Sequence, residues 1–247
     1  FVTKNIRVQT VIIIFLIIIF PLRKRSLYMS LNDLALSDFY SNPTPRLPIM
    51  LCLDTSWSMN DRMTELNAGV ELFYKEVYEN EIAQASAEIA LIKIGGDASL
   101  IKNFKTLEED DLKGSNLQAN GVTPLKEGVE MALDLLEQRK IMYKSAGISY
   151  YQPWLVIMSD GAPTDQRGNI LKDSDLVGIH ERLKELANTK KLVIFAIGIG
   201  QDVDMRKLQI FSPNRSVVRL KGNSFSNFFE WLSASVDVVS NSNPGDL

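Results

Sequence analysis

Residues 51–60 of the chain, "LCLDTSWSMN", set the interpretation of the whole sequence. An apolar run ends at Asp54, and Ser56 and Ser58 follow at alternate positions. An apolar run that lacks polar alternation and follows several prolines predicts a buried strand, beginning here near Ile49. One carboxylate and two hydroxyls therefore stand where a buried strand ends, which is where parallel sheets commonly bind ligands.

Strands and helices alternate along the rest of the chain. Apolar runs predict strands at 49–53, 87–95, 98–104, 153–160, 191–200 and 217–220, with a tight turn at 95–97, Gly-Gly-Asp. Helical spacing of apolar residues predicts helices at 63–78, 124–140, 175–190, 204–208 and 224–239. This alternation predicts an α/β fold, namely a doubly wound, mostly parallel central sheet with helices on both faces.

The length of the chain fits one large domain with short flanking segments. The expected division is an N-terminal extension at 1–28, a lead-in at 29–46, the domain at 47–240 and a tail at 241–247. The extension holds a wholly apolar run, "VIIIFLIIIF", which even when extended to 8–22 is shorter than the roughly 17–25 residues of a spanning helix. We interpret residues 1–28 as upstream sequence outside the native protein, and a short membrane anchor is the alternative.

Composition excludes several classes of function. A formal net charge of -3 provides no basic field for nucleic acid. The single histidine, His180, excludes a multi-histidine metal site. The single cysteine, Cys52, lies in an apolar run and is expected in the core, which fits a reducing compartment and a cytoplasmic location.

Small oxygen donors recur at one predicted edge of the sheet. They are Asp54, Ser56 and Ser58 after the first strand, Thr123 at the start of a helix, and Asp160 at the end of a later strand. Taken singly, each has an ordinary explanation as a turn or helix-cap residue. Taken together, two carboxylates and three hydroxyls without nitrogen or sulfur ligands indicate a site for a hard divalent cation, Mg²⁺ or else Mn²⁺ or Ca²⁺.

These segments resemble the von Willebrand factor type A (vWA) domain. Its metal-ion-dependent adhesion site (MIDAS) uses Asp-x-Ser-x-Ser, a later threonine and a later aspartate, and the resemblance covers residues 47–239. Within that superfamily, four segments are similar to the bacterial TerY-type proteins associated with tellurium resistance. They are "LDTSWSM", "GVTPL", "MSDGAPTD" and "FFEWLSASVDVVS".

The resemblance implies the metal ligands Asp54, Ser56, Ser58, Thr123 and Asp160, with one coordination position left for an Asp or Glu of a protein partner. It further implies a scaffold or regulatory subunit of a stress-response system with kinase-like or phosphatase-like partners. The chain departs from the family pattern at Trp57, where glycine is usual. The bulky ring either packs over the loop or anchors a partner at the surface.

Two alternatives to a metal-dependent binding module stay open. A metal-dependent phosphotransferase would use Asp54 as its nucleophile, but it typically needs a second aspartate where this chain has Ser56, so we expect no enzyme. The metal could instead only stabilise the loops. An oxyanion site for tellurite is disfavoured, because Arg62 alone offers a positive charge near the motif. The acidic run at 108–111 is interpreted as solvated surface.

Overall fold

The computed structural model describes residues 42–201, 203–220 and 225–245. The interpretation of residues 1–28, and of the lead-in up to residue 41, lies outside this part of the chain. Among the residues that are described, no helix has the length and apolar character needed to cross a membrane.

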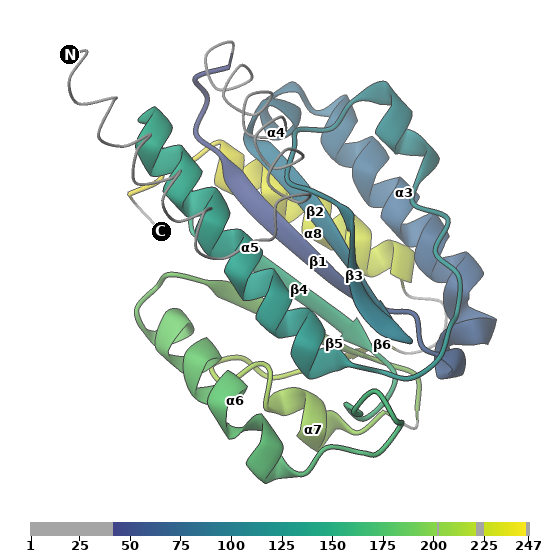
Figure 1. Ribbon diagram of the computed structural model, residues 1–247. Coiled ribbons are helices and arrows are strands. Elements are labelled where there is room, and N and C mark those ends of the chain that lie inside the picture. Colours follow the sequence, from purple (N-terminus) through teal and green to yellow (C-terminus); the bar gives the residue numbers. More distant parts are fainter. Residues whose placement is uncertain (1–41, 202, 221–224, 246–247) are drawn as a thin grey trace, which may run out of the picture.

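A six-stranded sheet forms the centre of the domain (Figure 1), in the order β3-β2-β1-β4-β5-β6. The strands are β1 (Leu47–Asp54), β2 (Ala87–Gly95), β3 (Asp97–Lys102), β4 (Trp154–Ser159), β5 (Val193–Ile199) and β6 (Val218–Leu220). Only β2 and β3 pair antiparallel, through the predicted tight turn, and every other neighbouring pair is parallel. The expected doubly wound, mostly parallel sheet is confirmed.

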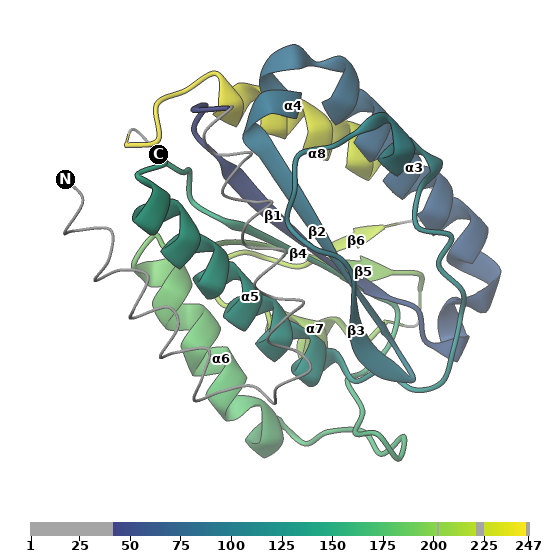
Figure 2. The ribbon, with the colours of Figure 1, turned by 45° about the horizontal axis from the view of Figure 1, so that its top comes forward.

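Helices cover both faces of the sheet (Figure 1, Figure 2). One face carries α3 (Met63–Glu79), α4 (Glu81–Ser86) and α8 (Phe225–Ser240), and the other carries α5 (Leu125–Ala146), α6 (Asp173–Asn188) and α7 (Met205–Gln209). Two 3-10 helices, η1 (Trp57–Arg62) and η2 (Glu109–Lys113), lie in loops. The helix α4 was not predicted, because six residues are too few to show helical spacing.

The residues of β1 are buried throughout, because this strand is central and covered on both sides. Alternate side chains enter the two cores: Ile49 and Leu51 pack with α3 and α8, while Met50 and Cys52 pack with α5 and α6. The predicted core position of Cys52 is confirmed, and burial raises the pKa of its thiol. This thiol is therefore an inert core group rather than a nucleophile.

The interpretation of the acidic run as solvated surface is only partly right. Asp111 forms ion pairs with Lys102 and Lys105, at 3.0 and 3.1 Å. Its carboxylate also accepts a hydrogen bond from the backbone of Glu108 in the capping box that begins η2. The run thus fixes the loop between the sheet edge and α5, while Asp110 remains solvated.

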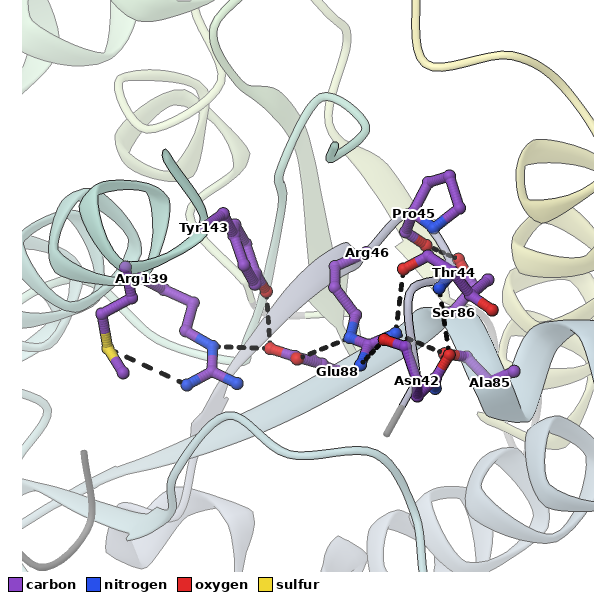
Figure 3. A network of polar contacts seen from close by, with 10 residues as sticks. Asn42, Thr44, Pro45, Arg46, Ala85, Ser86, Glu88, Arg139 and Tyr143 are labelled. Carbon is purple, nitrogen blue, oxygen red and sulfur yellow. Dashed lines mark hydrogen bonds and ion pairs between the residues drawn. The ribbon is translucent and has the colours of Figure 1, made fainter. Parts of the chain in front are cut away.

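A buried ion-pair network centres on Glu88 (Figure 3). It lies at the start of β2, and so at the end of the domain opposite Asp54, the last residue of β1. Glu88, on β2, is fully buried and receives the Nε atoms of Arg46 at 3.1 Å and of Arg139 at 2.6 Å. The hydroxyl of Tyr143 donates a hydrogen bond to the same carboxylate. The guanidinium of Arg46 also donates to the backbone oxygens of Asn42 and Ala85. This network joins the lead-in, β2 and α5 at the amino ends of the strands.

We expect Glu88→Ala to lower the free energy of unfolding by about 3–5 kcal/mol, because the substitution removes the carboxylate that both buried guanidiniums contact. Urea denaturation would measure the loss. Glu130→Ala provides the matched control, since Glu130 forms only an exposed pair with Lys126 at 4.0 Å and should change stability by less than about 1 kcal/mol. Equal effects of the two variants would contradict an anchoring role of the network.

Candidate metal centre

The predicted site residues meet where the order of strands along the sheet reverses. The chain proceeds from β1 to one side of the sheet through β2 and to the other through β4, so the carboxyl ends of β1 and β4 border a crevice. Asp54 is the last residue of β1, and Asp160 follows β4. Because Leu53 pairs with Met158 in parallel register, the two aspartates leave neighbouring strands at the same edge.

Asp54 lies at the bottom of the site and is fully buried. Its Oδ1 accepts a hydrogen bond from the backbone N–H of Ser56 at 2.8 Å, and its Oδ2 accepts one from the hydroxyl of Ser159. The first contact turns the chain back over the carboxylate, and the second connects β1 to β4. Both oxygens of this side chain are therefore held in place.

Ser56 and Ser58 connect the first loop to Asp160. Their hydroxyl oxygens lie 3.0 Å apart, and the Ser58 hydroxyl donates to Oδ1 of Asp160 at 2.7 Å. Ser56 is buried, whereas Ser58 is exposed. The alternate spacing of the two serines thus brings both hydroxyls to one side of the loop, with the outer one open to solvent.

Thr123 is held beside this cluster by its backbone. Its N–H donates to the hydroxyl of Thr164 at 3.0 Å, and its carbonyl accepts from the Thr164 N–H at 2.9 Å. A Cβ built on Gly161 would lie 3.9 Å from the Thr123 hydroxyl, so that hydroxyl faces the turn after Asp160. In the described structure it makes no hydrogen bond to the other four predicted ligands, and α5 begins at Leu125 with Pro124 as its N-cap.

Backbone hydrogen bonds join the three loops around the site. The N–H of Trp57 donates to the carbonyl of Gly121, and the N–H of Gly96 donates to that of Val122. Gly121 has a φ of +58°, and a Cβ there would lie 2.6 Å from the Cα of Gly96. Only glycine permits this conformation at such a close approach, so Gly121 fixes the path of the loop that carries Thr123.

Trp57 does not disturb the loop in which it stands in place of glycine. Its backbone makes the contact to Gly121 at 3.0 Å, and its side chain is 64% exposed. Most of the ring therefore lies in solvent, and at most a minor part of it packs over the loop. The other alternative, an aromatic anchor at the partner surface, stays a prediction.

Three further residues belong to the site although the sequence did not assign them to it. Arg62 donates from Nη1 to Oδ2 of Asp160 at 2.8 Å and to the carbonyl of Ser58 at 3.1 Å. Ser159 and Thr164 make the contacts already described. Their hydroxyls lie within ordinary turn sequences, and the only sequence signal was their closeness to Asp160. Asp165 accepts hydrogen bonds from Asn169 and orders its own loop.

Burial makes the negative charge of the site costly. It raises the pKa of Asp54 to about 6, although hydrogen bonds from Ser159 and Ser56 act in the opposite direction. Burial also raises the pKa of Asp160, against the Ser58 hydrogen bond and the charge of Arg62. Two neighbouring carboxylates with raised pKa values are a site that a cation would stabilise.

The chemistry of the donors fits a hard divalent cation. Asp54 and Asp160 offer carboxylate oxygens and the serines and Thr123 offer hydroxyls, so the set contains oxygen alone. Within the described residues, no group of three or more His, Cys, Asp or Glu side chains could hold a metal ion by itself. Binding at this edge would therefore depend on the hydroxyls.

In the presence of EDTA, we expect the stability of the wild type relative to Asp54→Asn to fall as the pH rises from about 4 to about 6. The folded state binds the extra proton in this window, because the pKa of Asp54 is raised from 3.8 to about 6 on folding. The difference in unfolding free energy between the two proteins should change by on the order of 1–3 kcal/mol, measured by urea denaturation at each pH. Parallel pH profiles would contradict the raised pKa.

We expect Gly121→Ala to destabilise the domain more than Gly147→Ala. Both glycines have positive φ values, +58° and +73°, so either substitution strains the backbone by about 1–2 kcal/mol. Nothing lies within 4 Å of a Cβ at Gly147, whereas one at Gly121 would collide with Gly96. Urea denaturation of both variants isolates the effect of the collision. Equal losses of unfolding free energy would show that the loop can move to accommodate the added Cβ.

Comparison with known proteins identifies a family and several structures with a similar fold. The family model of the von Willebrand factor type A domain matches residues 49–230. The vWF domain of the type V pili tip protein Mfa5 from Porphyromonas gingivalis has a TM-score of 0.61 at 12% identity, covering 81% of this chain and 98% of that one. The pilus adhesin SpaC from Lactobacillus rhamnosus GG has a TM-score of 0.61 at 14% identity, covering 78% of this chain and 30% of that one. No match was found among curated proteins.

A third similar structure is proximal thread matrix protein 1 from the mussel byssus, solved with a zinc-occupied MIDAS motif. Its TM-score is 0.52 at 18% identity, and the match covers 81% of this chain and 47% of that one. This chain thus spans less than half of the mussel protein and of the adhesin, and the likeness to all three structures concerns the fold. Since the family model covers most of its length, the chain belongs to the von Willebrand factor type A domain family.

Proposed function

We propose that this domain binds a protein partner through a divalent cation held by Asp54, Ser56, Ser58, Thr123 and Asp160. The observation that carries the proposal is the pairing of two buried carboxylates from neighbouring strands within one cluster of hydroxyls. A single arginine offsets only part of their charge. A cation at this edge would supply a strong positive charge and a coordination position for a carboxylate of the partner.

The shape of the site supports binding from outside the domain. Ser58 is exposed, so the cluster opens to solvent beyond the first loop. The ring of Trp57, next in the chain, is 64% exposed and offers an apolar contact beside the cluster. Large aromatic side chains often anchor interfaces when they lie at the centre of the contact. A partner segment with an acidic residue beside an apolar one would match both features.

Magnesium is our proposed cation, with manganese and calcium as alternatives. Carboxylate and hydroxyl oxygens suit all three ions, and Mg²⁺ commonly uses one or two carboxylates together with other oxygen ligands. The zinc-occupied MIDAS motif in the mussel protein supports a divalent cation at the corresponding edge of this fold.

The narrower proposal is that the chain acts as a scaffold or regulatory subunit in a bacterial TerY-type system for stress or tellurium resistance. It is supported by the resemblance of "LDTSWSM", "GVTPL", "MSDGAPTD" and the C-terminal "FFEWLSASVDVVS". The partners would be kinase-like or phosphatase-like proteins of the cytoplasm. A scaffold or regulatory subunit needs no catalytic activity. A phosphotransferase is also disfavoured, because Ser56 occupies the place of its second aspartate.

The test is a pull-down from lysate of the native cell, using the whole chain with Mg²⁺ and with EDTA. We expect a partner that the wild type retains only with Mg²⁺ and that Asp54→Ala fails to retain. Asp61→Ala is the matched control, because this aspartate is exposed on η1 and contacts only Asn60. It should behave like the wild type, and circular dichroism should show that all three proteins are folded.

Partners that appear equally with Mg²⁺ and with EDTA would exclude the cation as the point of contact. If Mg²⁺ then raised the thermal stability of the wild type but not of Asp54→Ala, the site would be a structural one. Identification of the retained partner by mass spectrometry tests the narrower proposal, which fails if no kinase-like or phosphatase-like protein is present.

A further inference from the structure

We propose that Arg62 adjusts the metal centre in two opposite directions: it weakens the binding of the cation and strengthens the binding of an acidic partner to the loaded site. The inference rests on the proposed function, which it deepens by giving a role to a residue outside the ligand set. Arg62 acts here as a positioning and charge-setting residue and not as a ligand.

The geometry places the guanidinium of Arg62 against the ligands. Its Nη1 lies 2.8 Å from Oδ2 of Asp160 and 3.1 Å from the carbonyl of Ser58. The other oxygen of Asp160 accepts from the Ser58 hydroxyl. Arg62 thus occupies one of the two carboxylate oxygens that a cation could use, and it competes with the cation for that oxygen.

Gly200 makes room for this arginine. A Cβ built on Gly200 would lie 2.7 Å from Nη2 of Arg62, and the φ of +86° at this position also favours glycine. Gly200 is the last residue of the run "AIGIG" and directly follows β5. This run carries no nucleotide-binding pattern. The structure gives another reason for the glycine, because the guanidinium of Arg62 lies against it.

A count of formal charges gives the direction of each effect. The carboxylates of Asp54 and Asp160 contribute -2 and Arg62 contributes +1, so the cluster carries -1 without metal and +1 with a divalent cation. One carboxylate from a partner then brings the total to zero. Without Arg62, the loaded cluster is already neutral and attracts an acidic side chain less.

Arg62 also has the means to contact a partner directly. Its side chain is 34% exposed, and Nη1 alone makes the two contacts within the site. A guanidinium carries five N–H donors in a planar fork, which suits the two oxygens of a carboxylate. The donors on Nη2 and Nε lie beside Gly200 and are not used by the contacts to Ser58 and Asp160.

The experiment measures cation and carboxylate binding separately in the whole chain. Isothermal titration with Mn²⁺ gives the affinity for the metal alone. Titration of the Mn²⁺-loaded protein with acetate at constant ionic strength, followed by water proton relaxation, gives the affinity for a simple carboxylate. The variants are Arg62→Gln, Arg62→Lys and the control Arg182→Gln, which removes an equal charge from an exposed pair with Asp134.

We expect Arg62→Gln to bind Mn²⁺ about two- to fivefold more tightly and acetate about two- to fivefold more weakly, as for the loss of a partly exposed charge pair. Arg62→Lys should lie between the wild type and Arg62→Gln, because it keeps the charge and loses the fork. Arg182→Gln should match the wild type in both titrations. Damage to the loop would weaken both kinds of binding, so opposite changes separate the proposed role from a structural one.

Two kinds of result would overturn the inference, and they differ in what they mean for the proposed function. If the wild type and Arg62→Gln both bind Mn²⁺ but agree in their affinities, or if both affinities fall together, the role of Arg62 is wrong and the proposed function stands. If neither protein binds Mn²⁺ or Mg²⁺, the proposed function fails and this inference fails with it.

Discussion

The parallel pairing of β1 with β4 is the constraint on which the rest of the site depends. Parallel strands end at the same edge, so the residues that follow Leu53 and Met158 emerge side by side. Asp54 and Asp160 thereby become neighbours although they lie far apart in the sequence. Antiparallel pairing would have sent one of them to the opposite end of the sheet. Every later feature of the site serves to hold, separate or neutralise these two carboxylates.

Burial of two neighbouring negative charges is unfavourable, and several contacts in the domain offset part of this cost. Hydrogen bonds from Ser159, Ser58 and the backbone of Ser56 reach the two carboxylates, and Arg62 supplies one positive charge. These contacts leave the pKa of both groups raised, since burial outweighs them. The charged forms of both carboxylates are therefore only partly stabilised by the protein, and a cation at this edge would stabilise them further. Perturbed pKa values of this kind are common at binding sites.

The sequence predicted the features that depend on periodicity and strand ends. Uniformly apolar runs predicted the central strands, and the alternation with helices predicted the edge at which Asp54 and Asp160 meet. It did not predict the contacts of Arg62, which depend on how η1 turns back toward β4, or those of Thr164, which depend on two loops meeting. Nor did it predict that Glu88 is buried, because its partners Arg46 and Arg139 lie 42 and 51 residues away.

The location of the buried network has a consequence for how the domain is attached to anything else. The chain enters the sheet beside Arg46. It leaves the domain after α8, where the hydroxyl of Tyr151 donates hydrogen bonds to the carbonyls of Ser240 and Ser242. Both points lie at the base, while β1 carries the backbone roughly 23 Å away before it reaches Asp54. A tether, label or neighbouring domain joined at this base would stand at the end opposite the candidate metal centre. A label placed at residues 42–46 or 240–245 would therefore leave the edge that carries Asp54 and Asp160 uncovered.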